Sequence, residues 1–346
     1  MTSPDVNGAP QIESIEPNCA LPGGEVRITG RALRPQELQR PEVRFGNVNG
    51  SIVISSEQFI VARVPEGASS GDVVVATNGH RSNPREVRVA VPVAENLHPV
   101  ANPAVDAEGN IYATFSGSRG QTVPVAIFRI GRSQEITPFV SEMMNPTGMA
   151  LGHDGSLYVS SRYDGSVYRV SGNGSVTSFA EGLGVATGIA FDTEGNLYVG
   201  DRSGTIFKIG RDGQIFVFAM IEPSVSAFHL AFDNDGNLYV TGPTTSSFDA
   251  VHRVDPQGHV EVFYRGLGRP QGLAFDVQGN LYVAASLHGR RGIVKLTPDR
   301  QASLAVSGQN LVGLAFGPGG TAVLATTSGV LSLACGIQGR TLIPSI

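Results

Sequence analysis

The sequence predicts an all-β protein of two domains, a small two-sheet β-sandwich followed by a six-bladed β-propeller. Its 346 residues include 44 glycines and 21 prolines, which divide many short apolar runs. Residues 10–91 contain alternating β-type segments, whereas residues 98–346 repeat a short word of the type Gly-Asn-Leu-Tyr-Val. Because this length exceeds the usual size of one hydrophobic core, two domains are expected.

The N-terminal segments alternate in the way that half-buried strands do. Val26 and Ile28 alternate with Arg27 and Thr29, so one face of this segment is apolar and the other polar. About seven short strands within residues 10–91 indicate a small sandwich of two sheets. The segments are QIESI, EVRITG, PEVRFG, SIVI, FIVARVP, GDVVVAT and REVRVAV.

The same region resembles an IPT/TIG domain, which has an immunoglobulin-like fold. The resemblance implies a spacer or a protein-interaction module, and some such domains bind DNA in transcription factors. No cluster of basic and aromatic loop residues in this region favours the DNA-binding version. The motifs that carry the resemblance are Ile15-Glu16-Pro17, Pro22-Gly23-Gly24-Glu25-Val26-Arg27-Ile28-Thr29-Gly30, Val43-Arg44-Phe45-Gly46, Val64-Pro65, Gly71-Asp72-Val73-Val74-Val75 and Ser82-Asn83-Pro84.

Residues 92–97 are expected to form a short linker. The segment Pro-Val-Ala-Glu-Asn-Leu is too short for a flexible tether, so a semi-rigid arrangement of the two domains is expected.

From residue 98 the repeat determines the architecture. The word recurs at intervals of 46, 40, 41, 43 and 41 residues, counting from Asn110 through Ser156, Asn196, Asn237 and Asn280 to a degraded copy at Thr321. A period near 40 that contains only strands is typical of a propeller with one four-stranded blade per repeat. Six copies therefore predict six blades.

One repeat can be divided into strands in full. Residues 188–191, 197–199, 205–209 and 214–218 are expected to form its four strands, and residues 192–196 the turn between the first two. Gly and Asn supply the turn geometry and the Asp side chain can accept hydrogen bonds from the turn amides. Every blade is expected to use contiguous residues, with residues 340–344 as the last outer strand, and the ring to close by side-chain packing.

The repeats resemble NHL repeats, and more broadly the six-bladed propellers of the gluconolactonase and strictosidine-synthase type. The resemblance rests on Thr187-Gly188-Ile189-Ala190-Phe191-Asp192 and Gly195-Asn196-Leu197-Tyr198-Val199 and covers residues 98–346. It implies a ring that hosts lactonases, lyases and pure binding proteins. In the lactonase-like enzymes a central divalent cation is held by oxygen ligands that include carboxylates. The corresponding positions here contain no carboxylate; they are Asn102, Thr147, Thr187, Phe228, Gln271 and Val312.

His229 interrupts the glycine pattern of the inner strands. It stands where four other repeats place Gly148, Gly188, Gly272 and Gly313, so its ring is expected near the mouth of the central channel. It is a candidate general base or metal ligand, and the alternative is a hydrogen-bonded histidine that fills a wide channel.

Arginines gather in the loops expected on one face of the ring. An arc of guanidinium groups can hold an anionic ligand or an acidic protein segment, because each forms two hydrogen bonds with a carboxylate or phosphate. Local pairing with Asp164 and Asp201 is the alternative. The arc comprises Arg119, Arg162, Arg202, Arg269, Arg290 and Arg291, and Asn102, Thr147, Thr187 and Gln271 are further candidate ligand-binding residues.

Charge and composition exclude some classes. A net charge of −5 gives no reason to expect nucleic-acid binding.

The chain shows no signal peptide in its first residues and no run that could span a membrane. Localisation is open, although the resemblance suggests an extracytoplasmic or cell-surface bacterial protein. Cys19 and Cys335 leave their pairing state open.

The sequence therefore predicts a ligand- or protein-binding propeller with an immunoglobulin-like accessory domain. The expected partner is a small anionic molecule or a protein segment, and no metal or other cofactor is expected. The alternative is a metal-dependent lactonase or other hydrolase, or a lyase, and only this alternative implies a divalent cation.

Overall fold

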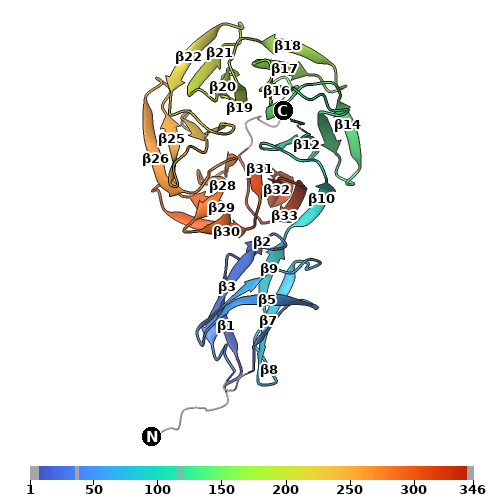
Figure 1. Ribbon diagram of the computed structural model, residues 1–346, viewed down its shortest axis with the longest axis vertical. Helices are drawn as coiled ribbons and strands as arrows, with labels where there is room; N and C mark the ends of the chain where they lie inside the picture. Colours follow the sequence, from blue (N-terminus) through green and yellow to red (C-terminus); the bar gives the residue numbers. More distant parts are fainter. Residues whose placement is uncertain (1–7, 36–38, 116, 119, 341–346) are drawn as a thin grey trace.

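The computed structural model describes residues 8–35, 39–115, 117–118 and 120–340. It shows a ring of small sheets with a second, elongated β-domain attached to its outer edge (Figure 1). The all-β class and the propeller arrangement are confirmed. The single short helix within the described residues is a 3₁₀ turn, η1 (Pro318–Gly320).

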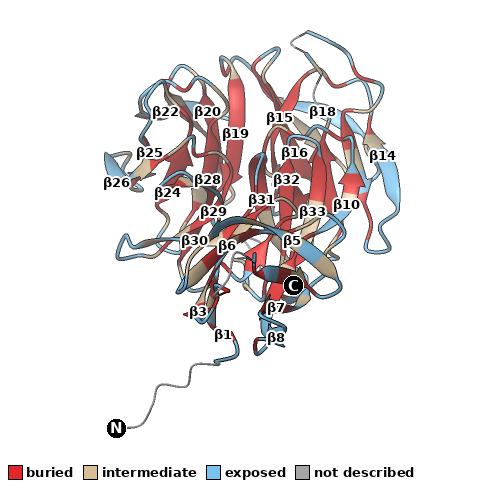
Figure 2. Ribbon diagram, turned by 60° about the horizontal axis from the view of Figure 1, so that its bottom comes forward, coloured by how far each residue is buried: buried red, intermediate tan, exposed pale blue. Residues whose placement is uncertain are grey.

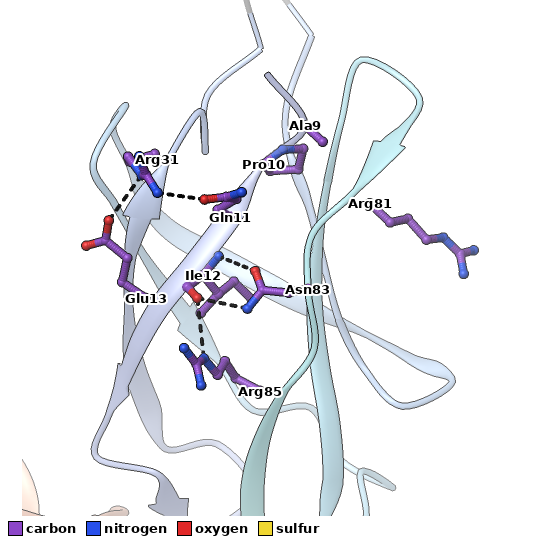
Figure 3. Close-up of a pocket in the computed structure, with 9 residues that line it drawn as sticks. All are labelled: Ala9, Pro10, Gln11, Ile12, Glu13, Arg31, Arg81, Asn83 and Arg85. Carbon is purple, nitrogen blue, oxygen red and sulfur yellow. Dashed lines mark hydrogen bonds and ion pairs between the residues drawn. The ribbon is translucent and has the colours of Figure 1, made fainter. Parts of the chain in front are cut away.

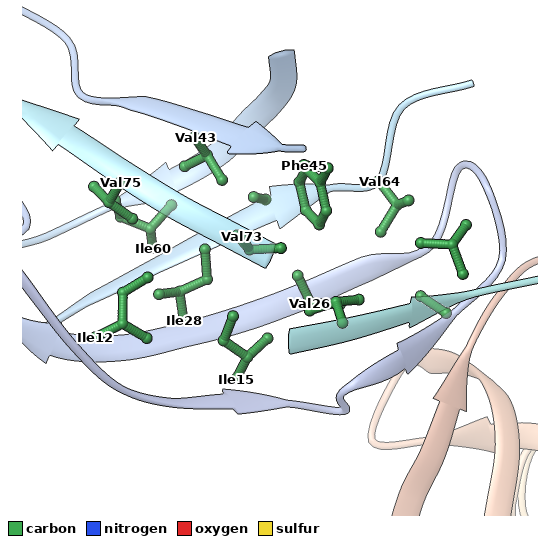
Figure 4. Packing of buried hydrophobic residues seen from close by; sticks show 14 of the residues in the cluster. Ile12, Ile15, Val26, Ile28, Val43, Phe45, Ile60, Val64, Val73 and Val75 are labelled. Carbon is green, nitrogen blue, oxygen red and sulfur yellow. The ribbon is translucent and has the colours of Figure 1, made fainter. Parts of the chain in front are cut away.

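The N-terminal domain is the predicted sandwich. Its apolar core includes Val26, Ile28, Ile60 and Val75, each at most 1% exposed, and the strands enclose it (Figure 4). The alternation of Val26 and Ile28 inward with Arg27 outward confirms the pattern expected for a half-buried strand. The strands are β1 (Gln11–Glu16), β2 (Cys19–Ala20), β3 (Glu25–Arg31), β4 (Glu42–Phe45), β5 (Val48–Ser55), β6 (Phe59–Arg63), β7 (Gly71–Thr77), β8 (His80–Arg81) and β9 (Arg85–Val89).

The ring is built from antiparallel sheets whose strands follow one another outward from the centre. Four of them use contiguous residues: β11 (Ala104–Val105), β12 (Ile111–Thr114), β13 (Ile127–Ile130) and β14 (Ile136–Val140); β15 (Pro146–Leu151), β16 (Leu157–Ser161), β17 (Ser166–Val170) and β18 (Val176–Ala180); β19 (Ala186–Phe191), β20 (Leu197–Asp201), β21 (Thr205–Ile209) and β22 (Ile215–Met220); β23 (His229–Phe232), β24 (Leu238–Thr241), β25 (Asp249–Val254) and β26 (Val260–Leu267).

The prediction of six separate blades requires correction. Five four-stranded sheets stand alone, and the fifth of them consists of β10 (Val91–Glu95), β31 (Leu311–Gly317), β32 (Thr321–Thr326) and β33 (Gly329–Ala334). The remaining ring strands are β27 (Leu273–Phe275), β28 (Leu281–Leu287), β29 (Arg290–Leu296) and β30 (Ala302–Ser307). They belong to a 13-stranded sheet that includes the sandwich, because β2 pairs with both β9 and β30. The count of separate blades is therefore five rather than six.

The last sheet also corrects the expectation that every blade uses contiguous residues. Its outer strand is β10, which lies in the segment expected to be a linker and pairs antiparallel with β33. Residues 336–340 instead cross the turns of neighbouring sheets, where Arg340 donates its backbone N–H to Phe275. The rest of the strand expected at 340–344 lies outside the described residues. The ring thus closes by hydrogen bonds between residues far apart in the sequence.

The repeated word has the structural role predicted for it. In the turn after β19, Asp192 accepts the backbone N–H of Asn196 at 2.8 Å and its side-chain amide at 2.8 Å. Tyr198 then packs edge-to-face between Phe218 of its own sheet and Phe232 of the next, with centroid distances of 4.9 Å to each. Two other repeats form the same arrangement around Tyr158 and Tyr239.

The sandwich and the ring share one apolar cluster. Cys19, Leu21 and Ala90 from the sandwich side pack with ring residues that include Tyr282 and Leu333. The Leu21 N–H donates to the Ser307 carbonyl at 2.8 Å, which extends the pairing between β2 and β30. Inner strands of the ring such as β19 are buried, whereas outer strands such as β14 are exposed (Figure 2).

Candidate functional site

The inner strands of the ring approach one another so closely that they leave room only for glycine. A Cβ added to Gly148 would lie 2.3 Å from the Thr187 carbonyl oxygen, and one added to Gly188 would lie 2.3 Å from that of Phe228. Gly313 meets the Ala101 carbonyl oxygen in the same way, at 2.7 Å. The repeated glycine therefore permits backbone contact around the ring centre.

The polar residues beside these glycines form hydrogen bonds that join neighbouring sheets. Thr187 donates its hydroxyl to the Gly200 carbonyl at 2.8 Å and accepts the Phe228 N–H at 3.1 Å. Asn102 donates to the Leu273 carbonyl at 3.0 Å and accepts the Leu314 N–H at 3.1 Å. These hydrogen bonds use the side-chain polar groups of Thr187 and Asn102, which the sequence indicated as candidate ligand-binding residues.

Thr147 and Gln271 complete this inner layer. The Thr147 hydroxyl donates to the Asn145 carbonyl at 3.2 Å and is 1% exposed. The Gln271 carbonyl accepts the Thr241 hydroxyl at 2.5 Å, so its main chain also joins two sheets. Binding of a ligand by the four inner polar residues stays a prediction.

His229 lies at the inner end of β23, opposite Thr241 of β24. It is only 3% exposed, and its ring has no hydrogen-bond partner among the residues that the structure describes. Burial lowers the pKa of His229 to about 4, because an imidazolium ion without a partner is unfavourable away from water. The side chain is therefore neutral at physiological pH.

Two predicted arginines are held over the loop face by main-chain carbonyls. Arg162 donates to the Gly117 carbonyl at 3.3 Å, and Arg202 donates to the Val225 carbonyl at 2.9 Å. The neighbouring aspartates bond elsewhere, since Asp164 accepts the Tyr168 hydroxyl at 2.7 Å and Asp201 accepts the Val185 N–H at 2.8 Å. Among the described ion pairs, none includes Arg202.

Arg269 belongs to the same surface through a chain of loop contacts. The Val225 N–H donates to the Pro243 carbonyl at 2.9 Å, which joins the loop before β23 to the loop after β24. The second loop ends at Asp249, whose carboxylate accepts the Thr244 N–H at 2.9 Å and the Arg269 N–H at 3.2 Å. Asp249 is 1% exposed and thus fixes both loops from beneath.

We call four residues on the loops joined by these contacts the loop patch: Arg202, Val225, Phe248 and Arg269. Phe248 is 65% exposed and Val225 is 46% exposed. Arg269 is also exposed and, like Arg202, takes part in no ion pair within the described part of the chain. The joined loops therefore carry two arginines and two exposed apolar residues.

Two other predicted arginines lie near the junction with the sandwich. Arg290 donates to the carbonyls of Glu16 at 3.2 Å and Glu25 at 3.5 Å, so it supports the junction with the sandwich. Arg291 is exposed beside it at the start of β29, and Arg119 lies outside the described residues. Among the described arginines of the predicted arc, Arg290 thus lies at the junction with the sandwich rather than on the loops that carry Arg202 and Arg269.

Sequence reasoning missed Val225, Phe248 and Asp249. An exposed phenylalanine at the end of a polar loop, Gly242-Pro243-Thr244-Thr245-Ser246-Ser247-Phe248, was the available signal. Its significance depends on the pairing of this loop with the one before β23, which no local pattern reveals.

Two cavities lie outside the ring centre. One of about 430 Å³ is at the free end of the sandwich, where Asn83 accepts the Ile12 N–H at 2.8 Å and donates to the Ile12 carbonyl at 3.0 Å (Figure 3). Asn83 thereby occupies the open edge of β1. The other, of about 310 Å³, lies between the sandwich and the last sheet, beside Arg88 and Gly336.

Neither a metal-ligand cluster nor a membrane-spanning helix is found in the described ranges. No three His, Cys, Asp or Glu side chains come together there. No helix there is long and apolar enough to cross a membrane.

Comparisons with known proteins agree with this architecture. Residues 10–88 match the IPT/TIG domain and residues 221–249 match a beta-propeller repeat. The sequence has no match among curated proteins. The TIG resemblance is confirmed, whereas the assignment of the repeats to the NHL type stays a prediction.

Solved structures show the same fold at low sequence identity. A protein provisionally assigned as a gluconolactonase is 20% identical, with a TM-score of 0.60 over 73% of this chain and 94% of its own. An auxiliary nutrient binding protein from Bacteroides thetaiotaomicron is 12% identical, with a TM-score of 0.55 over 95% of this chain and 98% of its own. An inactive virginiamycin B lyase from Staphylococcus aureus, with quinupristin, is 15% identical, with a TM-score of 0.52 over 95% and 96%.

Proposed function

We propose that this chain is a binding protein whose loop patch holds an anionic ligand that also carries an apolar group. The observation that supports this proposal is the set of loop contacts that ties Arg202 to the exposed Val225, and the backbone of Arg269 to Asp249, the neighbour of the exposed Phe248. A small acid and an acidic protein segment share the required chemistry. Recognition rests on the arginines and the apolar contact, not on a metal.

The physical basis is the combination of charge and apolar area. A guanidinium group can donate several hydrogen bonds to a carboxylate. In Arg202 the Nη2 already donates to the Val225 carbonyl and the Nε is buried, so a ligand would be bound through the outer end of the group, Nη1 and the second N–H of Nη2. Burial of Phe248 and Val225 against a ligand contributes roughly 25 cal/mol for each Å² of apolar surface removed from water. Arginine is enriched among the residues that carry most of the binding energy of an interface, and phenylalanine is enriched in interfaces relative to the rest of the surface.

The rigid support beneath the patch favours binding over a merely mobile loop. Asp249 fixes the loop after β24 and the backbone of Arg269 at once. A surface that is already ordered loses less conformational entropy when its ligand binds.

The wider proposal places the protein outside the cytoplasm, as suggested by similar folds described as auxiliary nutrient binding proteins. It also treats β27–β30 as a sixth blade that has merged with the sandwich sheet through β2. Figure 1 shows these strands within the ring, between β26 and β31.

The lyase or metal-dependent hydrolase alternative rests on His229. Its buried, unpartnered ring near the inner end of β23 is the observation that favours this second candidate. A reaction with a lactone or with quinupristin that is lost in His229→Ala, but retained in Arg202→Ala, would support the enzyme and count against the binding proposal.

The test is a thermal-shift screen of the purified chain against sugar acids, aliphatic and aromatic acids, and acidic peptides that contain one aromatic residue. A ligand that binds only the folded state raises the melting temperature. We expect a hit whose shift is lost in the double variant Arg202→Ala/Arg269→Ala and retained in Arg211→Ala, which changes an arginine in a turn at the other end of the strands. Hits limited to free acids or to peptides distinguish the two ligand sources.

A further inference from the structure

The two cysteines of the chain lie together at the junction between the sandwich and the ring. They are far apart in the sequence, since Cys19 is in β2 and Cys335 directly follows β33. Both are free thiols in the structure, and both are buried, at 6% and 9% exposure. They belong to the apolar cluster that the two domains share. The chain contains no other cysteine.

Strand pairing brings the two cysteine segments to the same place. β2 pairs in parallel with β9, and Cys19 lies opposite Arg88 in this pairing. β33 comes within 8 Å of the same strand β9, measured between Cα atoms. The Arg88 side chain reaches the second segment, because a Cβ added to Gly336, the neighbour of Cys335, would lie 3.1 Å from Arg88 Nη1. Arg88 therefore flanks both cysteines.

The electrostatics of Cys19 agree with this proximity. Burial raises the pKa of the Cys19 thiol to about 11, and Cys335 contributes more to this rise than any other neighbouring group. A thiol with this pKa is protonated at neutral pH. Cys19 is therefore unreactive toward a small oxidant unless a second sulfur has already been activated beside it.

Cys335 is the thiol that a small molecule can approach. A cavity of about 310 Å³ lies between the sandwich and the last sheet, and the residues on both sides of Cys335, Ala334 and Gly336, line it. Gly320 lines it as well, and its carbonyl accepts the Cys335 Sγ–H at 3.5 Å. An oxidant that enters this cavity thus meets the segment of Cys335 first.

We propose that Cys19 and Cys335 form a disulfide that fastens the sandwich to the ring. The oxidant is a small disulfide such as oxidised glutathione. The Cys335 sulfur attacks one sulfur of the oxidant, which breaks the S–S bond of the oxidant, forms a mixed disulfide and releases one thiol. The Cys19 sulfur then attacks the Cys335 sulfur and releases the second thiol. The two cysteines lose two hydrogen atoms, and the reduced oxidant carries them.

This bond closes almost the whole chain into one loop. Cys19 precedes all but one of the strands, and Cys335 follows the last of them. A disulfide stabilises a fold by restricting the unfolded chain, and the effect increases with the length of the closed loop. We expect the oxidised chain to melt at least about 3 °C above the reduced chain. The inference is independent of the loop patch.

Refolding of the reduced chain in a mixture of oxidised and reduced glutathione tests the proposal. We expect no free thiol, an intact mass lower by two hydrogen atoms, and one tryptic product that joins residues 1–27 to residues 301–340. Melting of this product with and without a reductant measures the gain in stability. The variant Cys19→Ala/Cys335→Ala is the matched control, and its melting temperature should not respond to the reductant.

Single variants test the order of the two steps. Folded Cys19→Ala should accumulate glutathione on Cys335, whereas folded Cys335→Ser should leave Cys19 unmodified. Two free thiols after refolding, or a disulfide between two chains, would overturn the proposal. Equal melting temperatures of the oxidised and reduced wild type would show that the bond does not fasten the domains. Equal modification of the two single variants would overturn the stated order.

Discussion

At the scale of single residues, His229 shows how one substitution in a repeat changes the chemistry of a position. Four repeats use glycine there because the inner strands touch, whereas His229 brings a buried ring without a hydrogen-bond partner among the described residues. The sequence predicted an unusual position from the broken pattern. It could not reveal the burial, which depends on the neighbouring sheets.

The pH dependence of stability follows from the low pKa of His229. The unfolded chain binds a proton near pH 6.5, but the folded chain does so only near pH 4. The unfolded state thus holds more protons between these values, so the free energy of unfolding falls as pH decreases through this window. The loss is on the order of 3 kcal/mol.

Urea unfolding at pH 7 and pH 4.5 checks this expectation. His229→Gln, which cannot take up a proton, should be less sensitive to this pH change than the wild type. The exposed His80→Gln should retain the wild-type dependence. In both variants, the pH dependence of the free energy of unfolding that remains includes a contribution from His252, because burial also lowers the pKa of this residue. Equal pH dependence in His229→Gln and wild type would contradict a neutral, buried His229.

At the scale of elements, the repeat word allowed the strands and turns to be predicted. Residues 188–191 fall within β19 and residues 205–209 match β21, because a turn and an apolar strand are encoded locally. The closing strand β10 was not predicted, since its segment contains no repeat word and pairs with residues 329–332. The loop patch was missed for the same reason: it depends on contacts between loops.

The loop patch depends on the buried carboxylate of Asp249. Asp249→Ala leaves the N–H groups of Thr244 and Arg269 without their acceptor. We expect unfolding to require about 1 to 3 kcal/mol less free energy and ligand affinity at the patch to fall at least about fivefold. Urea titration and calorimetric binding measure the two effects. The control is Asp255→Ala, in an exposed turn near the other end of the strands, which should not affect binding. Unchanged ligand affinity in Asp249→Ala would contradict the role of Asp249 in supporting the loop patch.

At the scale of the whole molecule, the sandwich and the ring form one continuous structure. The sequence indicated two domains with different patterns, and both are present. Their joint sheet and shared core were beyond prediction, because β2 is only two residues long and carries no distinctive pattern. The semi-rigid arrangement expected from the short linker arises instead from strand pairing.

Leu21 tests this coupling. It belongs to the sandwich segment but is 3% exposed within the cluster shared with the ring. Leu21→Ala should lower the free energy of unfolding by about 2 to 5 kcal/mol, and it should shift the unfolding of both domains together. Near-ultraviolet circular dichroism and hydrogen exchange at β28 and β33 would detect this. Destabilisation confined to the sandwich would show that the ring closes without it.

The central claim is that the loop patch binds an anionic, partly apolar ligand. The most direct measurement is calorimetric titration of the strongest acidic hit from the ligand screen into wild type, Phe248→Ser and Arg202→Ala/Arg269→Ala. The account predicts saturable binding to the wild type, weakening of about tenfold in Phe248→Ser and of at least about a hundredfold in the arginine variant. Equal affinity in all three folded proteins would contradict it.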